Sequence, residues 1–250
     1  MRRLLTGLEP GRVLAALLLL SAAMSGCART SEGPSPMPTP TPETSMTAPS
    51  MIPLPAPSLS GSASVEEALA GRRSVRDYVA ASLTIEQLSQ LLWSAQGITE
   101  RRYGLRSAPS AGALYPLEVY VAAEHVDGLA TGVYRYVPRQ HGLQVVVDRS
   151  VRGQLFRDAL SQSAVADAPA TLAFAAVFAR TTQKYGERGR RYVYMEVGHA
   201  AENVYLQATA LGLGTVAIGA FDDDSAKRTL GMRGDEEPLC LMPVGRPASQ

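Results

Sequence analysis

The stretch that decides the fold of this chain is Arg106-Ser107-Ala108-Pro109-Ser110-Ala111-Gly112-Ala113-Leu114-Tyr115-Pro116-Leu117-Glu118. Small residues between two prolines favour a tight backbone path, along which a flat ligand could approach the main chain closely. The stretch leads into residues 117–123, whose apolar residues predict a β-strand. An ordinary structured loop before a strand would have a similar composition, so the function of this loop depends on the rest of the chain.

Helical and strand patterns alternate on both sides of this loop. Before it, a short helix is expected over residues 65–69, and a capping box at Thr84 and Gln87 predicts a helix that ends at Gly97. After it, the patterns predict a hairpin (133–137 and 143–147), a buried strand (171–179), a long helix (194–211), a strand (216–221), a capped helix (222–230) and a last strand (238–244). Helices and strands mixed in this way predict an α+β fold with a central sheet of mixed strand order.

A second motif, Gly71-Arg72-Arg73-Ser74-Val75-Arg76, lies between the two helices expected before the loop. Planar guanidinium groups bind phosphate bidentately and a hydroxyl adds a hydrogen bond, so this motif predicts a compact anion site. A solvated basic turn is the alternative that the motif alone leaves open.

Two further motifs lie near the C-terminal end. Gly212-Leu213-Gly214-Thr215-Val216-Ala217-Ile218-Gly219-Ala220-Phe221 is not a phosphate loop, because no Lys-Ser/Thr pair follows it and it leads into an expected strand. The fourth motif, Gly245-Arg246-Pro247, follows the last expected strand.

In this order, the four motifs resemble the FMN-dependent nitroreductase superfamily over nearly all of residues 64–247. The resemblance implies a nitroreductase-like homodimer, with a mixed central sheet flanked by helices and FMN at the subunit interface. The implied contacts are Arg72, Arg73, Ser74 and Arg76 to phosphate and ribityl, Pro109, Ser110, Ala111 and Gly112 to the flavin from the partner subunit, Gly219 and Ala220 to the N5 edge, and Arg246 to the phosphate. Many nitroreductases have an acidic residue where Gly219 stands, so here the contact would come from the main chain.

Within that superfamily the chain is similar to the SagB-type, azoline-oxidase-like branch. The similarity lies in the loop and in Gln183-Lys184-Tyr185-Gly186-Glu187-Arg188, followed by Gly198-His199-Ala200-Ala201-Glu202-Asn203. In azoline oxidases a Lys-Tyr pair acts in deprotonation, so the resemblance implies catalytic roles for Lys184 and Tyr185. A lysine in a desolvated site can serve as a base. The alternative is that both are surface loop residues.

Metal and nucleic-acid sites are not expected. A metal site at His199 would need a second histidine at suitable spacing, and His125 and His141 lie in other segments. We therefore expect His199 to be a hydrogen-bonded packing residue. The net charge of +1 provides no basic field for nucleic acid.

The N-terminus has the features of an export signal. Three arginines precede the apolar run of residues 13–20, and small residues follow up to Cys27. Residues 23–27 resemble a bacterial lipobox, which implies a lipoprotein signal peptide over residues 1–26 and a lipidated Cys27 that anchors the exported protein to a membrane. An ordinary secretory signal cleaved nearby is the alternative.

The region after Cys27 predicts a spacer. Residues 27–60 are rich in Pro, Ser and Thr, which indicates an extended tether, and residues 61–250 would form the FMN domain. The sequence thus favours an FMN-dependent oxidoreductase that acts on a small organic substrate. Two alternatives are an azoline dehydrogenase that acts on a modified peptide, and a non-catalytic flavin-binding lipoprotein.

Overall fold

The structure is a computed structural model that describes residues 51–248. The expected signal peptide, Cys27 and most of the expected tether lie outside these residues. Within the described part of the chain, no helix is both long enough and apolar enough to span a membrane.

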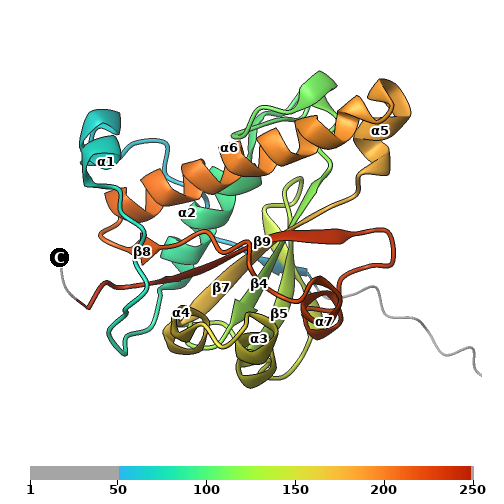
Figure 1. The fold of residues 1–250 in the computed structure, drawn as a ribbon. Coiled ribbons are helices and arrows are strands. Elements are labelled where there is room, and N and C mark those ends of the chain that lie inside the picture. Colours follow the sequence, from blue (N-terminus) through green and yellow to red (C-terminus); the bar gives the residue numbers. More distant parts are fainter. Residues whose placement is uncertain (1–50, 249–250) are drawn as a thin grey trace, which may run out of the picture. The chain divides into compact units, whose positions relative to one another are not determined.

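A seven-stranded sheet with the order β1-β6-β5-β4-β7-β9-β8 forms the centre of the fold (Figure 1). Neighbouring strands pair antiparallel throughout, and a parallel bridge joins Ser74 to Thr215 at one edge. Its strands are β1 (Met51–Pro53), β4 (Leu117–Ala123), β5 (Gly132–Val137), β6 (Gly142–Val147), β7 (Ala170–Ala176), β8 (Gly214–Thr215) and β9 (Glu237–Gly245). A separate two-stranded sheet holds β2 (Ile98–Glu100) and β3 (Leu105–Arg106).

Helices cover both faces of the sheet, which confirms the α+β prediction. One core lies between the sheet and the helices α2 (Ile85–Gln96) and α6 (Arg188–Ala210). The other lies between the sheet and α3 (Arg152–Asp158), α4 (Ser163–Asp167) and α7 (Asp223–Thr229). Alternate residues of β4 supply both cores: Val119 and Val121 point to the first, Tyr120 and Ala122 to the second.

The helix α6 is the longest element and organises the rest of one face (Figure 1). The short helices α1 (Val65–Gly71) and α5 (Ala179–Tyr185) pack against it, and Figure 1 shows them at its opposite ends. This arrangement fixes the positions of the motifs, because one of them directly follows α1 and another forms the end of α5.

Two local expectations were wrong. Residues 216–221 form no strand, because the N–H of Ala217 donates to the hydroxyl of Tyr205 and only Ile218 bridges to Leu241 in β9. The strand expected over residues 171–179 ends at Ala176, and the chain turns into α5, which was not predicted.

The expected boundary between tether and domain at residue 60 was also wrong. β1 adds an edge strand to β6, and Leu54 after it is buried, with 8% of its surface exposed. His141 and Ser89 contact the carbonyl of Pro55 at 2.9 and 2.7 Å. Proline is tolerated on an edge strand because its missing N–H faces outward. The strand was not predicted because the composition around it is rich in proline.

Candidate functional site

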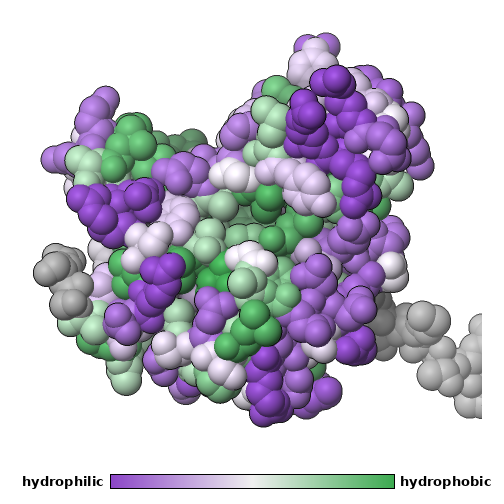
Figure 2. Space-filling view, viewed as in Figure 1, coloured by the Kyte–Doolittle hydropathy of each residue, from purple (hydrophilic) through white to green (hydrophobic). Residues whose placement is uncertain are grey.

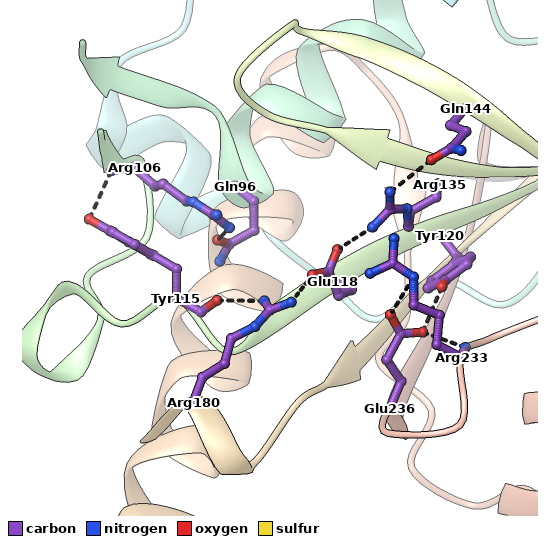
Figure 3. Close-up of polar contacts among 10 residues, drawn as sticks. All are labelled: Gln96, Arg106, Tyr115, Glu118, Tyr120, Arg135, Gln144, Arg180, Arg233 and Glu236. Carbon is purple, nitrogen blue, oxygen red and sulfur yellow. Dashed lines mark hydrogen bonds and ion pairs between the residues drawn. The ribbon is translucent and has the colours of Figure 1, made fainter. Parts of the chain in front are cut away.

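The loop of residues 110–115, called the 110–115 loop below, has a strained backbone. Gly112, Ala113 and Tyr115 have φ values of 65°, 54° and 47°, in the left-handed region that side-chain-bearing residues rarely adopt. The backbone N–H of Arg106 donates to the Tyr115 hydroxyl at 3.1 Å, and its guanidinium lies 4.5 Å from the ring centroid (Figure 3). The contacts between Arg106 and Tyr115 therefore join the two ends of the loop. Backbone strain like that at Ala113 and Tyr115 is found mostly at functional sites.

Arg180 of α5 holds the end of this loop. Its guanidinium donates to the carbonyl of Tyr115 at 3.1 Å and pairs with the carboxylate of Glu118, the second residue of β4 (Figure 3). A hydrogen bond thus joins α5 to the loop, and a partly buried ion pair joins α5 to β4.

Lys184 and Tyr185 meet the loop at Gly112. A β-carbon built on Gly112 would lie 2.7 Å from the Tyr185 Oη and 3.0 Å from the Lys184 Nζ. The Lys184 Nζ also lies 5.4 Å from the centroid of the Tyr185 ring. Two motifs that are far apart in the sequence therefore form one cluster, consisting of an amine, a phenol and a bare stretch of backbone.

A buried carboxyl group lies near the same loop. Only 2% of the surface of Glu196 on α6 is exposed, and burial raises its pKa to about 7, against the effects of the Ser110 hydroxyl and the Arg106 charge. Burial also lowers the pKa of Arg106, whose guanidinium donates to Gln96 at 2.8 Å. Glu196 was not predicted as a site residue, although its spacing from Val193 and Ala200 places it on the buried face of the helix.

The arginine segment, residues 72–76, lies beside β8. The N–H of Val75 donates to the carbonyl of Thr215, and the side chain of Ser74 lies 3.2 Å from the hydroxyl of Tyr205. The guanidinium of Arg72 lies 5.2 Å from the Tyr205 ring centroid. The Tyr205 hydroxyl also accepts the N–H of Ala217, so Tyr205 joins this segment to the motif of residues 212–221. The position of Tyr205 on a long helix did not predict this role.

The fourth motif pairs through its backbone with the residues that follow the arginine segment. The carbonyl of Arg246 accepts from the N–H of Val79 at 3.0 Å, and Tyr78 bridges to Pro247. Within residues 51–248, Arg72, Arg73, Arg76 and Arg246 have no carboxylate partner within 4.0 Å. A set of guanidinium groups without acidic partners, beside a serine hydroxyl, suits a phosphate group.

Gly219 and Ala220 of the third motif are exposed. Gly219 lines a surface hollow of about 370 Å³ together with Tyr194 of α6 and Phe221. Among the described residues, neither backbone N–H has a backbone acceptor, whereas the Ala220 carbonyl accepts from Gln162 at 2.9 Å. Free main-chain donors suit the contact that the family resemblance implies.

The two groups of motif residues lie far apart within one chain. Tyr185 packs edge-to-face on Tyr192 near the start of α6, whereas Arg72 lies over Tyr205 nearer its end. The 13 positions between Tyr192 and Tyr205 correspond to about 20 Å along a helix. The cluster at Gly112 and the arginine segment therefore lie near opposite ends of α6.

The expectation for His199 was wrong. The residue is exposed on α6, with no hydrogen bond to the rest of residues 51–248, because it lies outside the buried face that holds Ala200 and Val204. The described part of the chain holds no group of three or more His, Cys, Asp or Glu side chains arranged to bind a metal.

Comparisons with known proteins agree with this fold. The model of the nitroreductase family matches residues 69–246. A protein of Methanocaldococcus jannaschii named as a nitroreductase is 50% identical over 182 residues, which cover 73% of this chain and 90% of that protein. A solved nitroreductase structure from Ralstonia eutropha has a TM-score of 0.71 and 32% identity, over 80% of this chain and 90% of that one.

A more distant relative is the microcin B17-processing protein McbC of Escherichia coli. It is 27% identical over 156 residues, which cover 60% of this chain and 57% of McbC. The family match spans all four motifs, except the last residue of the fourth, together with Lys184 and Tyr185. The chain is therefore a member of the nitroreductase family, whose members are oxidoreductases.

Proposed function

We propose that the chain is an FMN-dependent oxidoreductase that acts as a homodimer. The arginine segment of one copy would hold the phosphate, and the 110–115 loop of the other would face the flavin. The observation that carries this proposal is the distance of about 20 Å along α6 between the two groups, since a second copy would supply one group at the position where the first copy supplies the other.

The exposed face of α6 supports association of two copies. Tyr194 and Met195 in its first half are 53% and 54% exposed, and Val65 and Leu69 of α1 are exposed as well. Figure 2 shows further apolar surface in the middle of the view, below α6, with hydrophilic residues among and around it. Exposed apolar residues that are surrounded by polar ones are typical of a protein interface.

Each group of residues would make a distinct contribution. Arg72, Arg76 and Arg246 would bind the phosphate, and the N–H groups of Gly219 and Ala220 would face the ring edge. Bound FMN would supply the acceptor or donor of a hydride or an electron pair. The loop, packed at Gly112 against Lys184 and Tyr185, would hold this amine and phenol beside the flat ring.

A second candidate function is oxidation of an azoline ring in a modified peptide. Such an oxidation removes a proton and a hydride from the ring, so a base must stand beside the hydride acceptor. The contact of Lys184 and Tyr185 with Gly112 favours this function, because it would bring an amine and a phenol to the proposed flavin site. The relation to a microcin-processing protein supports it. A non-catalytic flavin-binding lipoprotein is the third candidate.

We also propose export and membrane anchoring through lipidated Cys27, on the lipobox resemblance alone. NAD(P)H is scarce outside the cytoplasm, so dioxygen as the final acceptor of a dehydrogenase suits that location. Mass spectrometry of the mature N-terminus tests this proposal. An acylated Cys27 supports it, and a free N-terminus elsewhere contradicts it.

Purification of the full-length chain in detergent tests the flavin proposal. We expect one FMN per chain and a dimeric mass, and we expect Arg72→Ala/Arg76→Ala to lose the FMN. Arg101→Ala, at an exposed arginine outside the site, is the matched control and should keep it. A colourless protein that does not bind added FMN would contradict the proposal.

Mass spectrometry of the products separates the two catalytic functions. Incubation with an azoline-containing peptide should remove two hydrogens if the second function is correct, and Lys184→Ala should abolish this loss. Reduction of a nitroaromatic compound that is unaffected by Lys184→Ala, with no change in the peptide, would favour the first function. An FMN-loaded protein inert towards both would favour the third.

A further inference from the structure

The guanidinium of Arg180 binds two different elements at once. Its Nη1 donates to the carbonyl of Tyr115, at the end of the 110–115 loop, at 3.1 Å, and its Nη2 pairs with the carboxylate of Glu118 on β4 (Figure 3). A planar guanidinium presents its donors in fixed directions, whereas an ammonium group is a point charge on a flexible stem. Arg180 therefore fixes the first turn of α5 relative to both the loop and the sheet.

The carboxylate that Arg180 binds is itself held from the other side. The side chain of Glu118 is 12% exposed, and its Oε2 lies 3.4 Å from the Nη1 of Arg135 on β5. Arg135 in turn donates to Gln144, the residue opposite it on β6, at 2.7 Å. Figure 3 shows these side chains in a row across the sheet. Arg180 is thus attached to the sheet through a fixed acceptor.

The helix α5 and the 110–115 loop lie side by side and meet at two points. At the start of the helix Arg180 binds residue 115 of the loop, and at its end Lys184 and Tyr185 contact residue 112. Arg180 and Lys184 are four residues apart, which places them on one face of a helix, about 6 Å apart along its axis. The helix therefore runs antiparallel to the loop, and a change at the first contact should shift the second.

Other contacts hold α5 on α6 and not on the loop. Thr181 is buried, and a β-carbon built on Gly189 of α6 would lie 3.0 Å from its carbonyl. Tyr185, four residues after Thr181, packs edge-to-face on Tyr192 of α6, with the ring centroids 5.2 Å apart. Residues 181 and 185 therefore form the face of α5 towards α6, whereas residues 180 and 184 form the adjacent face. Arg180 holds this second face against the loop.

We propose that Arg180 is a positioning residue for Lys184 and Tyr185. By joining the loop to β4, its guanidinium directs one face of α5 towards the loop and so sets where the amine and the phenol stand. The consequence for catalysis rests on the proposed function, whereas the structural part does not.

Hydrogen exchange in the full-length chain tests the structural part without any flavin. In Arg180→Ala we expect the amides of residues 182–186 to exchange about tenfold faster, since two contacts of this face of the helix are lost. Arg135→Gln is the matched control, because it removes the other arginine of Glu118 and keeps both contacts of Arg180. Its exchange in residues 182–186 should equal that of the native chain. Native exchange in Arg180→Ala, or equal acceleration in both variants, would overturn the proposal.

Product analysis tests the consequence for catalysis. For a substrate whose turnover needs Lys184, Arg180→Ala should lower kcat about 100-fold with little change in KM, because the amine is displaced while the substrate still binds. Free guanidinium ion in the assay should restore part of this loss, since it can occupy the space of the missing group. The FMN content should stay native. A merely structural role would instead lower FMN content and the turnover of every substrate together, and that result would overturn the proposal.

If Arg180→Ala does not fold, Arg180→Lys decides. This variant keeps the charge and most of the stem, but its ammonium lacks the two directed donors. We expect residues 182–186 to exchange faster than in the native chain, and native exchange would overturn the proposal. A native chain that binds no FMN would refute the proposed function, while the exchange results would still decide whether Arg180 positions α5.

Discussion

A β-carbon on Gly112 would lie 2.7 Å from the phenolic oxygen of Tyr185, which is closer than non-bonded atoms approach. The 110–115 loop and the end of α5 therefore fit together only because residue 112 has no side chain. Glycine is also the residue that adopts the φ of 65° observed there without strain.

Gly112→Ala should therefore impair the site more than the fold. We expect a loss of about 1–2 kcal/mol from backbone strain, and about a 100-fold lower kcat/KM from displacement of Lys184 and Tyr185. Gly128→Ala is the matched control, since Gly128 has a φ of 80° and open space around it. Urea unfolding and steady-state kinetics measure the two effects. Equal activities of the two variants would disprove the tight contact.

Tyr205→Phe should weaken flavin binding with a modest loss of stability. The change removes the hydroxyl that accepts the Ala217 N–H at 2.7 Å and lies 3.2 Å from the Ser74 Oγ, but keeps the ring under Arg72. We expect about 1 kcal/mol lower stability and about tenfold weaker FMN binding, measured by unfolding and by fluorescence titration. Tyr103→Phe, at an exposed hairpin position, should change neither. An unchanged FMN affinity in Tyr205→Phe would remove Tyr205 from the site.

Deletion of residues 51–60 should destabilise the domain. A chain that begins at residue 61 lacks β1 and the buried Leu54, whose burial contributes about 2 kcal/mol. It also lacks the Pro55 carbonyl that contacts His141 and Ser89. We expect a lower midpoint of urea unfolding than for a chain that begins at residue 51. Equal midpoints would show that β1 contributes nothing.

Glu196 should make stability depend on pH in a defined direction. Because burial raises its pKa from 4.5 to about 7, the folded state binds the proton more tightly than the unfolded state. The resulting stabilisation is present below pH 4.5 and is lost as pH rises through 7, by at most about 3 kcal/mol. The unfolding free energy of Glu196→Gln minus that of the native chain should rise by this amount between pH 4.5 and 8. A constant difference would contradict the raised pKa.

Local patterns predicted much of the fold. The strand β4 and the capping box of α2 follow from the residues themselves, because a short apolar run and a Thr-Gln pair act within a few residues. The strand expected over residues 216–221 failed because the Ala217 N–H bonds to Tyr205 on a different element, which no local pattern reveals. β1 was missed because its proline-rich composition resembles a linker.

The sequence predicted the individual residues of the candidate site but not which of them contact one another. The family motifs identified Arg72, Gly112 and Lys184, but the contact between Gly112 and Lys184 depends on how α5 packs beside the loop. Glu196 was missed since a glutamate on a long helix is usually solvated, and only the tertiary structure shows its burial.

A defined mixed dimer tests the interfacial site most directly. One copy would carry Arg72→Ala/Arg76→Ala and the other Lys184→Ala/Tyr185→Phe, with two affinity tags to isolate the pair. If each site takes its arginines from one copy and its Lys-Tyr pair from the other, the mixed dimer contains one intact site. For a substrate whose turnover needs Lys184, it should then show about half of the native turnover, while both variant homodimers are inactive. A mixed dimer as inactive as its parents, although FMN-loaded and folded, would show that the site lies within one chain and would contradict the account.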